Sequence, residues 1–379
     1  MSEKREFDVL VVGGGVIGLS CAWRLAQRGA RVAVLERGDP GGGATRVAAG
    51  MLAPVGELTF GEPELLELTL AAARLYPEFV TELEAATGES TGYEVLGALH
   101  VALDRDEAAQ LRRVHDLQRS LELEAEWLPP RRCRELEPGL TPSFHGGVFA
   151  AGEAAVDPRA LTRVLLAACA AEGVEVHTGT EVVDGIFDGG RLVGVRTAKG
   201  HHDTHTVSNR PFDQEIAADA ILLAAGAWSG SVAWLPESAR PPVRPVKGQV
   251  VELRSRGVEP VARHILASER VYLVPRNDGR LVIGATVEEM GYDTAVTAGG
   301  VHELLREAYR LLPDVAEMEW VDATAGLRPG TPNNLPVVGP GAIEGLVLAT
   351  GHFRNGILLA PLAAQAVADL IASPDSNRR

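Results

Sequence analysis

Cysteine and lysine are scarce in this chain of 379 residues, and basic residues are outnumbered by acidic ones. The three cysteines, Cys21, Cys133 and Cys169, lie far apart. They therefore offer neither a disulfide framework nor a metal knuckle, and they suit a reducing compartment. Lysine occurs only three times, and 51 acidic residues against 36 basic ones give a net charge of −15. This balance opposes binding to nucleic acid or to an anionic membrane, both of which need surplus Lys and Arg.

We also expect the chain to lack long apolar segments. No apolar run approaches the roughly 18 residues of a membrane span. The charged N-terminus followed by a glycine-rich strand does not resemble a signal peptide. We therefore expect a cytoplasmic protein without a membrane span. The hydrophobic share of 46% and the charged share of 23% are normal for a globular protein, and the length suffices for two domains or one large two-part fold.

The first forty residues carry the pattern of a strand, a helix and a second strand. Phe7–Val12 is apolar and rich in β-branched residues, as is the segment 31–36, and both are typical of buried strands. Residues 18–28 between them have helical character and end at Gly29. This βαβ unit predicts a parallel sheet with a right-handed crossover.

Further along, the pattern alternates between helices and strands. We predict helices over 64–87, 106–123, 159–172 and 356–371, and strands over 175–178, 220–225, 271–275, 280–285 and 345–350. The Pro- and Arg-rich segment 127–142 indicates an irregular connection. Short alternating strands between residues 249 and 286 predict an antiparallel sheet. The order favours a discontinuous nucleotide-binding domain with a sheet domain inserted into it.

A glycine motif lies between the first strand and the first helix. Residues 13–18 match G-x-G-x-x-G: Gly13 allows a tight turn, Gly15 lets a pyrophosphate approach the backbone, and Gly18 lets the helix pack on the strand. The helix N-terminus offers free N–H groups to phosphates. Glu36, eighteen residues later, can accept ribose hydroxyls and would repel the 2′-phosphate of NADP. Three interpretations of this motif remain open: it binds NAD, it binds FAD, or it is a glycine turn without a ligand.

Four further segments favour FAD. Segments 220–226 and 345–351 are strands ending in a small residue and glycine, which lets the backbone pass close to an extended dinucleotide. The small residues of 45–51 can lie flat against an isoalloxazine ring. Segment 352–358 opens the last long helix, whose N-terminus would stabilise the negative charge of a reduced flavin. The alternatives are ordinary buried strands and a plain helix N-terminus.

Five motifs together carry a family resemblance. They are Gly-Gly-Gly-Val-Ile-Gly (13–18) with Glu36, Ala-Ala-Gly-Met-Leu (48–52), Pro-Val-Lys-Gly (245–248), Gly-Leu-Arg-Pro-Gly-Thr (326–331) and Gly-His-Phe-Arg-Asn-Gly-Ile-Leu-Leu-Ala-Pro (351–361). Over residues 7–372 the chain resembles the glycine oxidases, flavoproteins of the D-amino-acid oxidase family that are linked to thiamin synthesis.

This resemblance implies a mixed α/β fold of two domains. A Rossmann-like FAD-binding domain with a parallel sheet would comprise residues 1–90, 145–230 and 325–379. A substrate domain with a mixed, largely antiparallel sheet would comprise residues 91–144 and 231–324. The resemblance further implies non-covalent FAD, no metal and a homotetramer.

The resemblance also assigns site residues. Arg328 would bind the substrate carboxylate with help from Tyr272 and Arg354, and Met51 would contact the substrate. A planar Arg fork suits a carboxylate because it makes two parallel charge-assisted hydrogen bonds. The predicted cofactor-binding residues are Gly13, Gly15, Val16, Ile17, Gly18, Glu36, Arg37, Ala44, Thr45, Arg46, Ala49, Gly50, Met51, Val183, Gly226, His352, Phe353, Arg354, Asn355, Gly356, Ile357 and Leu358.

The implied reaction is removal of a hydride from the Cα of glycine, with sarcosine and small D-amino acids as further substrates. The imine would hydrolyse to glyoxylate and ammonia, or pass to a thiazole synthase, and O2 would be reduced to hydrogen peroxide. A D-amino-acid oxidase or dehydrogenase and a sarcosine oxidase-like demethylating enzyme remain alternatives. So do a flavin-binding sensor without turnover and an NAD-dependent dehydrogenase.

Several positions depart from the family pattern or offer a competing site. Arg46 stands where a small hydroxyl residue is frequent, Arg270 where a His occurs, and Val287 where a larger Met occurs. The last two put the preferred substrate in doubt. His201, His202 and His205 could form a zinc or nickel site, but their polar surroundings favour a solvated loop.

Overall fold

The first of two large sheets carries the predicted βαβ unit. A computed structural model describes residues 6–198, 215–257 and 260–372 of the chain. The strand order is β10-β11-β12-β1-β2-β9, with β19 beside β12 and β18 beside β19. Strands β9, β2, β1, β12 and β19 run parallel, so the predicted parallel sheet is confirmed. The strands are β1 (Phe7–Val12), β2 (Val32–Leu35), β9 (Glu175–His177), β10 (Val182–Asp188), β11 (Arg191–Thr197), β12 (Glu215–Leu223), β18 (Val337–Pro340) and β19 (Leu346–Thr350).

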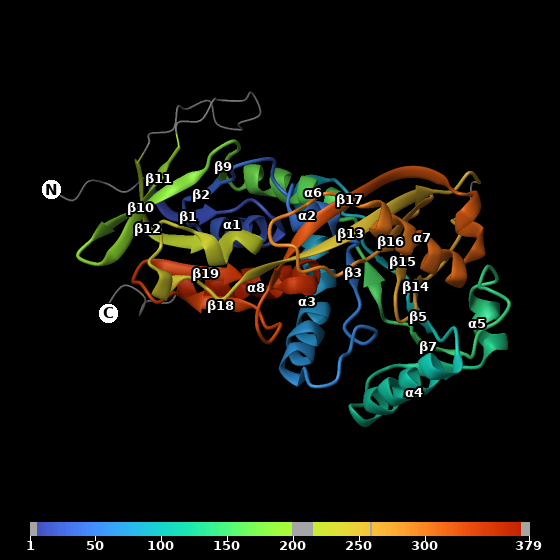
Figure 1. Ribbon diagram of the computed structural model, residues 1–379. Helices are drawn as coiled ribbons and strands as arrows, with labels where there is room; N and C mark the ends of the chain where they lie inside the picture. The colour runs from blue at the N-terminus through green and yellow to red at the C-terminus, as the bar shows by residue number, and fades with distance from the viewer. Residues whose placement is uncertain (1–5, 199–214, 258–259, 373–379) are drawn as a thin grey trace.

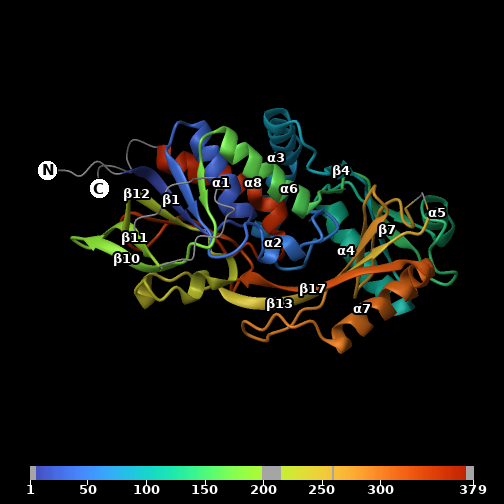
Figure 2. The same ribbon diagram turned by 90° about the horizontal axis from the view of Figure 1, so that it is seen from above.

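Four helices cover one face of this sheet (Figures 1 and 2). They are α1 (Val16–Gln27), α3 (Pro63–Thr87), α6 (Pro158–Ala171) and α8 (Gly356–Ala372). Strand β1 shows why both faces are buried: Val9 and Val11 pack against these helices, while Leu10 and Val12 belong to a second core with Trp234. Alternate residues of a strand point to opposite faces, so a continuous apolar run requires cover on both sides.

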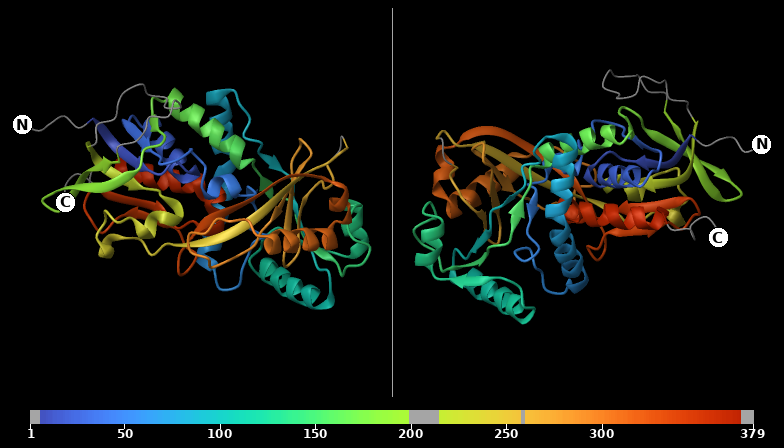
Figure 3. Two further views of the ribbon diagram at one scale, coloured as in Figure 1. Left: turned by 45° about the horizontal axis from the view of Figure 1, so that its top comes forward. Right: turned by 180° about the vertical axis from the view of Figure 1, so that it is seen from behind.

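The second large sheet is mostly antiparallel, with the order β17-β13-β16-β15-β14-β5-β7-β6. Its core is separate from the first. Strands β17 and β13 form one edge of this sheet, and α4, α5 and α7 lie at the end of the molecule farthest from β10–β12 (Figures 1 and 3). The strands are β5 (Ala98–Val101), β6 (Glu126–Leu128), β7 (Gly147–Ala150), β13 (Arg244–Arg254), β14 (Ile265–Ala267), β15 (Tyr272–Pro275), β16 (Arg280–Gly284) and β17 (Glu319–Gly330).

A third sheet and several further elements complete the fold. A three-stranded sheet pairs β3 and β4 with β8. The remaining bounds are β3 (Met51–Leu52), β4 (Glu94–Val95), β8 (Ala154–Ala155), α2 (Ala44–Val47), α4 (Arg105–Ser120), α5 (Pro130–Leu136), α7 (Ala298–Leu311) and the 3-10 helices η1 (Gly226–Ser231), η2 (Glu237–Ala239), η3 (Pro313–Glu317) and η4 (Phe353–Asn355).

Most predicted elements are present, and one prediction is wrong. The predicted helices and strands occur with ends shifted by a few residues; α1, for example, begins at Val16 rather than at residue 18. Segment 127–142 is not irregular, because it contains most of β6 and all of α5. Pro130 opens α5 at a first-turn position, where the missing N–H costs nothing. The predicted mixed α/β fold class is confirmed, and the boundaries between its domains remain a prediction.

Helix α8 corrects a second expectation. Together with η4 it runs from Phe353 to Ala372 and is long and apolar enough to cross a membrane by length and composition. The expectation that no apolar run approaches that length is therefore wrong. More than half of this segment is buried inside the fold, where it packs against α1 and α3. A helix that is apolar on most sides is typical of a protein core as well as of a membrane.

Candidate active site

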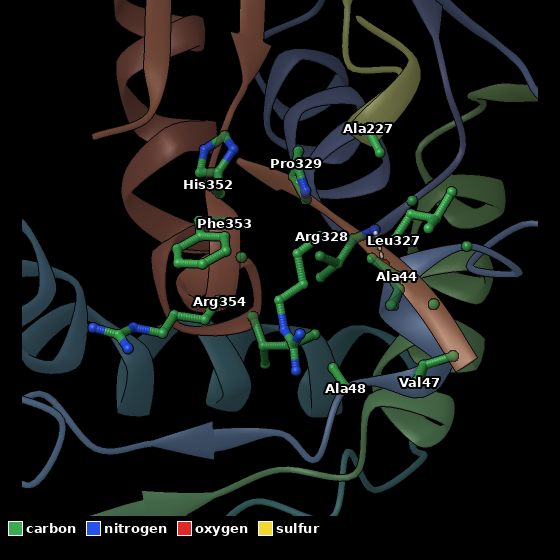
Figure 4. Close-up of a pocket in the computed structure, with 18 of the residues that line it drawn as sticks. Ala44, Val47, Ala48, Ala227, Leu327, Arg328, Pro329, His352, Phe353 and Arg354 are labelled. Atoms are coloured by element: carbon green, nitrogen blue, oxygen red, sulfur yellow. Dashed lines mark hydrogen bonds between the residues drawn. The ribbon is translucent and has the colours of Figure 1, made fainter. Parts of the chain in front are cut away.

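A cavity of about 1140 Å³ lies between the end of the first sheet and the near strands of the second. Its walls come from loops after β1, β2, β12 and β19, and from β15 and β17 of the second sheet. The volume exceeds the range of about 300–1,000 Å³ that is usual for small-molecule sites. It therefore suits a large cofactor together with a small substrate. Figure 4 shows part of its wall.

The glycine turn forms one end of the cavity. Gly13 has a φ of +112°, and a Cβ there would lie 2.5 Å from the carbonyl oxygen of Ala224. A Cβ on Gly18 would lie 1.9 Å from the carbonyl oxygen of Gly13. These contacts leave no room for side chains, as predicted. The N-cap residue of α1 is Gly15, which has no side chain to cap the helix. Among the first N–H groups of α1, that of Val16 donates to Thr45 Oγ1 at 3.1 Å. The first turn of α1 can therefore receive phosphate oxygens.

Glu36 stabilises the loops around this turn. Its carboxylate accepts hydrogen bonds from Gly14 N–H at 2.7 Å and from Gly38 N–H at 2.8 Å. A carboxylate has about four acceptor positions, so two backbone bonds leave capacity for ribose hydroxyls. Next to it, the Arg37 guanidinium lies 4.1 Å from the centre of the Trp228 ring, and Trp228 stacks on Tyr292. No sequence motif marks this aromatic cover.

Most predicted cofactor-binding residues line the cavity. Four do not: Gly18, Arg46, Asn355 and Leu358. Gly18 packs behind the turn, whereas Arg46 lines a small neighbouring pocket of about 20 Å³. The cofactor contacts of all these residues remain a prediction. Those lining the cavity are Gly13, Gly15, Val16, Ile17, Glu36, Arg37, Ala44, Thr45, Ala49, Gly50, Met51, Val183, Gly226, His352, Phe353, Arg354, Gly356 and Ile357.

His352 provides a direct test of whether a flavin fits. Its side chain is 2% exposed, and its Nε2 has no hydrogen-bond partner among the described residues. Burial lowers the pKa of His352 to about 4, so the imidazole is neutral near pH 7. A buried polar atom without a partner costs free energy. His352 lines the cavity beside the start of α8, so a polar atom of a flavin ring could supply the missing partner of Nε2. The glycine turn at the other side of the cofactor site would accommodate the phosphates of the same cofactor.

Arg328 and Tyr272 lie at the other end of the cavity. Each crosses a glycine: a Cβ on Gly248 would lie 2.2 Å from Arg328 Nη1, and a Cβ on Gly284 would lie 2.3 Å from the Tyr272 hydroxyl. Arg328 Nη1 donates to the carbonyl oxygens of Thr286 at 3.1 Å and Lys247 at 3.4 Å. Burial raises the pKa of Tyr272, although Arg328 opposes this. The phenol is therefore neutral and can donate a hydrogen bond beside the guanidinium.

The third predicted substrate residue, Arg354, has another orientation. Its Nη2 donates to Thr59 Oγ1 at 3.0 Å and lies 3.5 Å from Glu62 Oε2. Figure 4 shows its guanidinium directed away from that of Arg328. The structure therefore does not bring the two guanidinium groups together, and a substrate contact of Arg354 remains a prediction. Met51 on β3 lines the cavity, and its contact with the substrate remains a prediction.

Two titratable residues in the cavity wall had not been predicted. Burial raises the pKa of Glu57, while the charges of Arg354 and Arg328 oppose that rise. Burial lowers the pKa of His100 to about 4. Glu57 lies in the loop before α3 and His100 lies on β5 of the second sheet. Neither residue belongs to a motif with fixed spacing, so no sequence signal marked them.

The loop that carries Glu57 is held by a buried carboxyl group. Glu153 is 2% exposed, and its Oε1 accepts hydrogen bonds from Val55 N–H at 2.9 Å and Gly56 N–H at 3.2 Å. Its Oε2 has no partner among the described residues. Burial raises the pKa of Glu153 to about 8, against the opposing effect of the two backbone bonds. The group is therefore largely protonated near pH 7.

This raised pKa predicts how stability depends on pH. The folded-state pKa lies above the unfolded value of 4.5, so the contribution to the free energy of unfolding is complete below pH 4.5 and is lost as pH rises through 8. Glu153→Gln keeps a neutral group with the same shape. We expect its free energy of unfolding to gain on that of wild type between about pH 5 and 8, by up to about 1.4 kcal/mol per pH unit.

Thermal unfolding at several pH values checks this expectation. Glu124→Gln, at an exposed position after α4, is the control and should follow the wild-type profile. A constant difference between Glu153→Gln and wild type across the whole pH range would contradict a raised pKa at Glu153.

The fold and the cavity define an α/β protein whose cavity is large enough for an extended dinucleotide cofactor. A family model described as FAD dependent oxidoreductase matches residues 8–370. The chain belongs to this family, and it is an FAD-dependent enzyme.

Relatives and solved structures agree with this assignment. The chain is 36% identical to a glycine oxidase of Geobacillus kaustophilus, over 97% of this chain and 93% of that one. It is 37% identical to a glycine oxidase of Pseudomonas aeruginosa, over 98% and 95% of the two chains. The crystal structure of the Geobacillus kaustophilus glycine oxidase matches with a TM-score of 0.87 at 35% identity, covering 97% of this chain and 95% of that chain.

Another group of relatives is longer. The chain is 37% identical to a bifunctional ThiO/ThiG protein of Trichormus variabilis over 98% of this chain. It spans only 53% of that relative, about half its length. The activities and partners of the whole fused protein therefore bear on this chain only as proposals.

Proposed function

We propose that this protein oxidises glycine, and related small amines with a carboxylate, using non-covalent FAD. The observation that carries the proposal is the placement of Arg328 and Tyr272 across two glycines at the far end of a dinucleotide-sized cavity. The similarity to glycine oxidases over nearly the whole chain supports the same substrate. The three cysteines are buried outside the cavity lining, which agrees with a flavin that is not covalently bound.

In this proposal FAD supplies the hydride acceptor, and the chain supplies binding and orientation. The Arg328 guanidinium binds the substrate carboxylate with a planar pair of donors. The neutral Tyr272 hydroxyl donates a second hydrogen bond. Two contacts fix the direction of the Cα–H bond, which lowers the entropic part of the barrier. Glu57 lines the same cavity and interacts electrostatically with Arg328 and Tyr272.

The remaining parts of the proposal concern products and assembly. The imine hydrolyses to glyoxylate and ammonia, or is transferred to a thiazole synthase, as the fused ThiO/ThiG relatives suggest. Oxygen is the electron acceptor and hydrogen peroxide the second product. The protein is cytoplasmic and forms a homotetramer. We further propose that the five-segment domain division and the site residues predicted above hold for the bound state.

Two substitutions relative to the family pattern favour a broader substrate range. Val287 lines the cavity and is 70% exposed. Arg270 also lines it and is exposed. A smaller and more open wall accepts additional carbon atoms, each of which changes binding by about 1–3 kcal/mol. Sarcosine and D-alanine are therefore the appropriate competing substrates.

Anaerobic reduction of the purified holoenzyme tests the proposal. We expect a yellow protein whose flavin absorbance is bleached by glycine. Bleaching only by sarcosine or D-alanine would keep the reaction class and replace the substrate. A yellow protein that no amine reduces would refute the amine oxidase activity and favour the flavin-binding sensor. Glyoxylate and hydrogen peroxide are then measured after oxygen is admitted.

A further inference from the structure

We propose that Lys247 is a positioning residue that fixes the guanidinium of Arg328 for carboxylate binding. This inference rests on the proposed function, because it assigns to Lys247 a part in substrate affinity. Lys247 is one residue of the Pro-Val-Lys-Gly motif, to which the proposed reaction gives no task. It is the only lysine among the residues that the structure describes.

The Lys247 ammonium group is completely buried and paired with two carboxylates. Its side chain is 0% exposed, and Nζ lies 2.6 Å from Asp293 Oδ2 and 3.8 Å from Glu288 Oε2. Both carboxylates belong to the segment 286–293 that follows β16. Burial of an ammonium group is costly unless it is paired. The ion pairs therefore tie this segment to strand β13.

Further hydrogen bonds make the connection between β13 and segment 286–293 rigid. The backbones of Lys247 and Glu288 exchange two hydrogen bonds of 2.9 Å. Gln249 N–H donates to Thr286 Oγ1 at 2.9 Å, and Gln249 Nε2 donates to Glu288 Oε1 at 2.7 Å. Thr286 Oγ1 donates to the same carboxylate oxygen. Every polar group in this set has a role in fixing the backbone of residues 286–288 against β13.

Arg328 uses this connection as its support. Nη1 donates to one carbonyl oxygen on each side of it: Lys247 O on β13, at 3.4 Å, and Thr286 O in the following segment, at 3.1 Å. The side chain can reach both carbonyls because Gly248 has no Cβ. If segment 286–293 shifts relative to β13, the two carbonyls separate and Arg328 loses one of its acceptors. The geometry thus couples the Lys247 ion pairs to the direction of the Arg328 fork.

Removal of Lys247 leaves no buried unpaired charge, so the variants are testable. The side chains of Asp293 and Glu288 are 42% and 27% exposed, which lets water solvate them. Lys247→Met fills the same volume with an apolar group. Asp293→Asn removes one charge at an exposed position and leaves Lys247 with Glu288. The matched control is Glu289→Gln. Glu289 belongs to the same segment, and the substitution breaks its surface ion pair with Arg244 of β13.

The experiment uses holoenzyme of each variant and measures five quantities. They are the Kd of glycolate, a carboxylate without an amine, by calorimetry; the KM and kcat for glycine; the bound FAD fraction; and the melting temperature. We expect Lys247→Met to raise the glycolate Kd and the glycine KM about 10- to 100-fold, by misdirecting a charge-assisted hydrogen-bond pair. We expect kcat to change less than about threefold and the FAD fraction to remain as in wild type. Asp293→Asn should show a smaller effect of the same kind, and Glu289→Gln none.

Each outcome supports or overturns the inference. A wild-type Kd for glycolate in Lys247→Met overturns it and leaves the proposed function intact. A lower melting temperature and FAD fraction with unchanged KM in both Lys247→Met and Asp293→Asn also overturns it, because Lys247 would then only stabilise the fold. If wild-type holoenzyme neither binds glycolate nor reacts with glycine, the proposed function falls first and the inference with it.

Discussion

Replacing Arg328 by methionine should lower kcat/KM for glycine about 1,000-fold. Loss of one partner of a hydrogen-bonded charge pair costs about 2–5 kcal/mol, and each 1.4 kcal/mol is a factor of ten. Arg328 is held by the carbonyls of Thr286 and Lys247, so its fork is oriented before the substrate arrives. No other described residue of the cavity combines this support with a glycine beneath the guanidinium.

Arg328→Lys separates charge from geometry. Lysine keeps the positive charge but loses the planar pair of donors, so we expect an intermediate loss of about 30- to 100-fold. Steady-state kinetics and anaerobic reduction rates measure both variants. The FAD fraction should stay at the wild-type value, because Arg328 lies at the end of the cavity away from the glycine turn. The control Arg244→Met removes an exposed arginine of β13 and should leave kcat/KM unchanged. An Arg328→Met enzyme with wild-type KM would exclude Arg328 as the carboxylate ligand.

Gly18→Ala should abolish stable FAD binding. The new Cβ would lie 1.9 Å from the Gly13 carbonyl oxygen, far inside van der Waals contact, and the obstacle is backbone that cannot rotate away. The turn between β1 and α1 has to open, which displaces the N–H groups that receive the phosphates. We expect the Kd for FAD to rise at least about 100-fold, together with a loss of a few kcal/mol in the free energy of unfolding, as for overpacking in a core.

Gly299→Ala is the matched control for this substitution. Gly299 lies in helix α7, and a Cβ there meets nothing within 4 Å. Alanine should stabilise the helix by about 0.5–1 kcal/mol. Flavin content from absorbance and the melting temperature compare the two variants. A Gly18→Ala protein that retains FAD at the wild-type level would show that the glycine is not required for the cradle.

The parts of the fold that could be predicted from sequence are those with strong local signals. Strand β1 was correct to the residue because an apolar run ends in glycines, and the steric reasons assigned to Gly13 and Gly18 agree with the structure. The second sheet was recognised only in part. Its strand β5 pairs with β14 across more than 160 residues of chain, and such non-local pairing leaves no local pattern. Helix α5 was missed because Pro129 and Pro130 indicate a loop, whereas Pro130 stands in the first turn of the helix, where a missing N–H costs nothing.

In the candidate site, too, some residues could be predicted from the sequence and others could not. Motif residues such as Glu36 and Arg328 could be found because their residue types and spacing carry the chemistry. The direction of Arg354 could not, because it depends on Thr59, which lies 295 positions away in sequence. Glu57 and His100 have unusual pKa values only because folding buries them. Orientation and burial are properties of the assembled molecule and are absent from any short segment.

The long paired strands β13 and β17 restrict how the molecule can move when substrate enters. They pair from Arg244 to Arg254 and form a stiff two-stranded arm that connects the two sheets (Figure 2). At its near end the arm contacts η1 and α2, which also line the cofactor end of the cavity. A hinge motion between the two halves of the molecule would have to bend this arm and break its ladder of hydrogen bonds. Substrate therefore enters a cavity whose two ends keep a fixed separation, without a closure of whole domains.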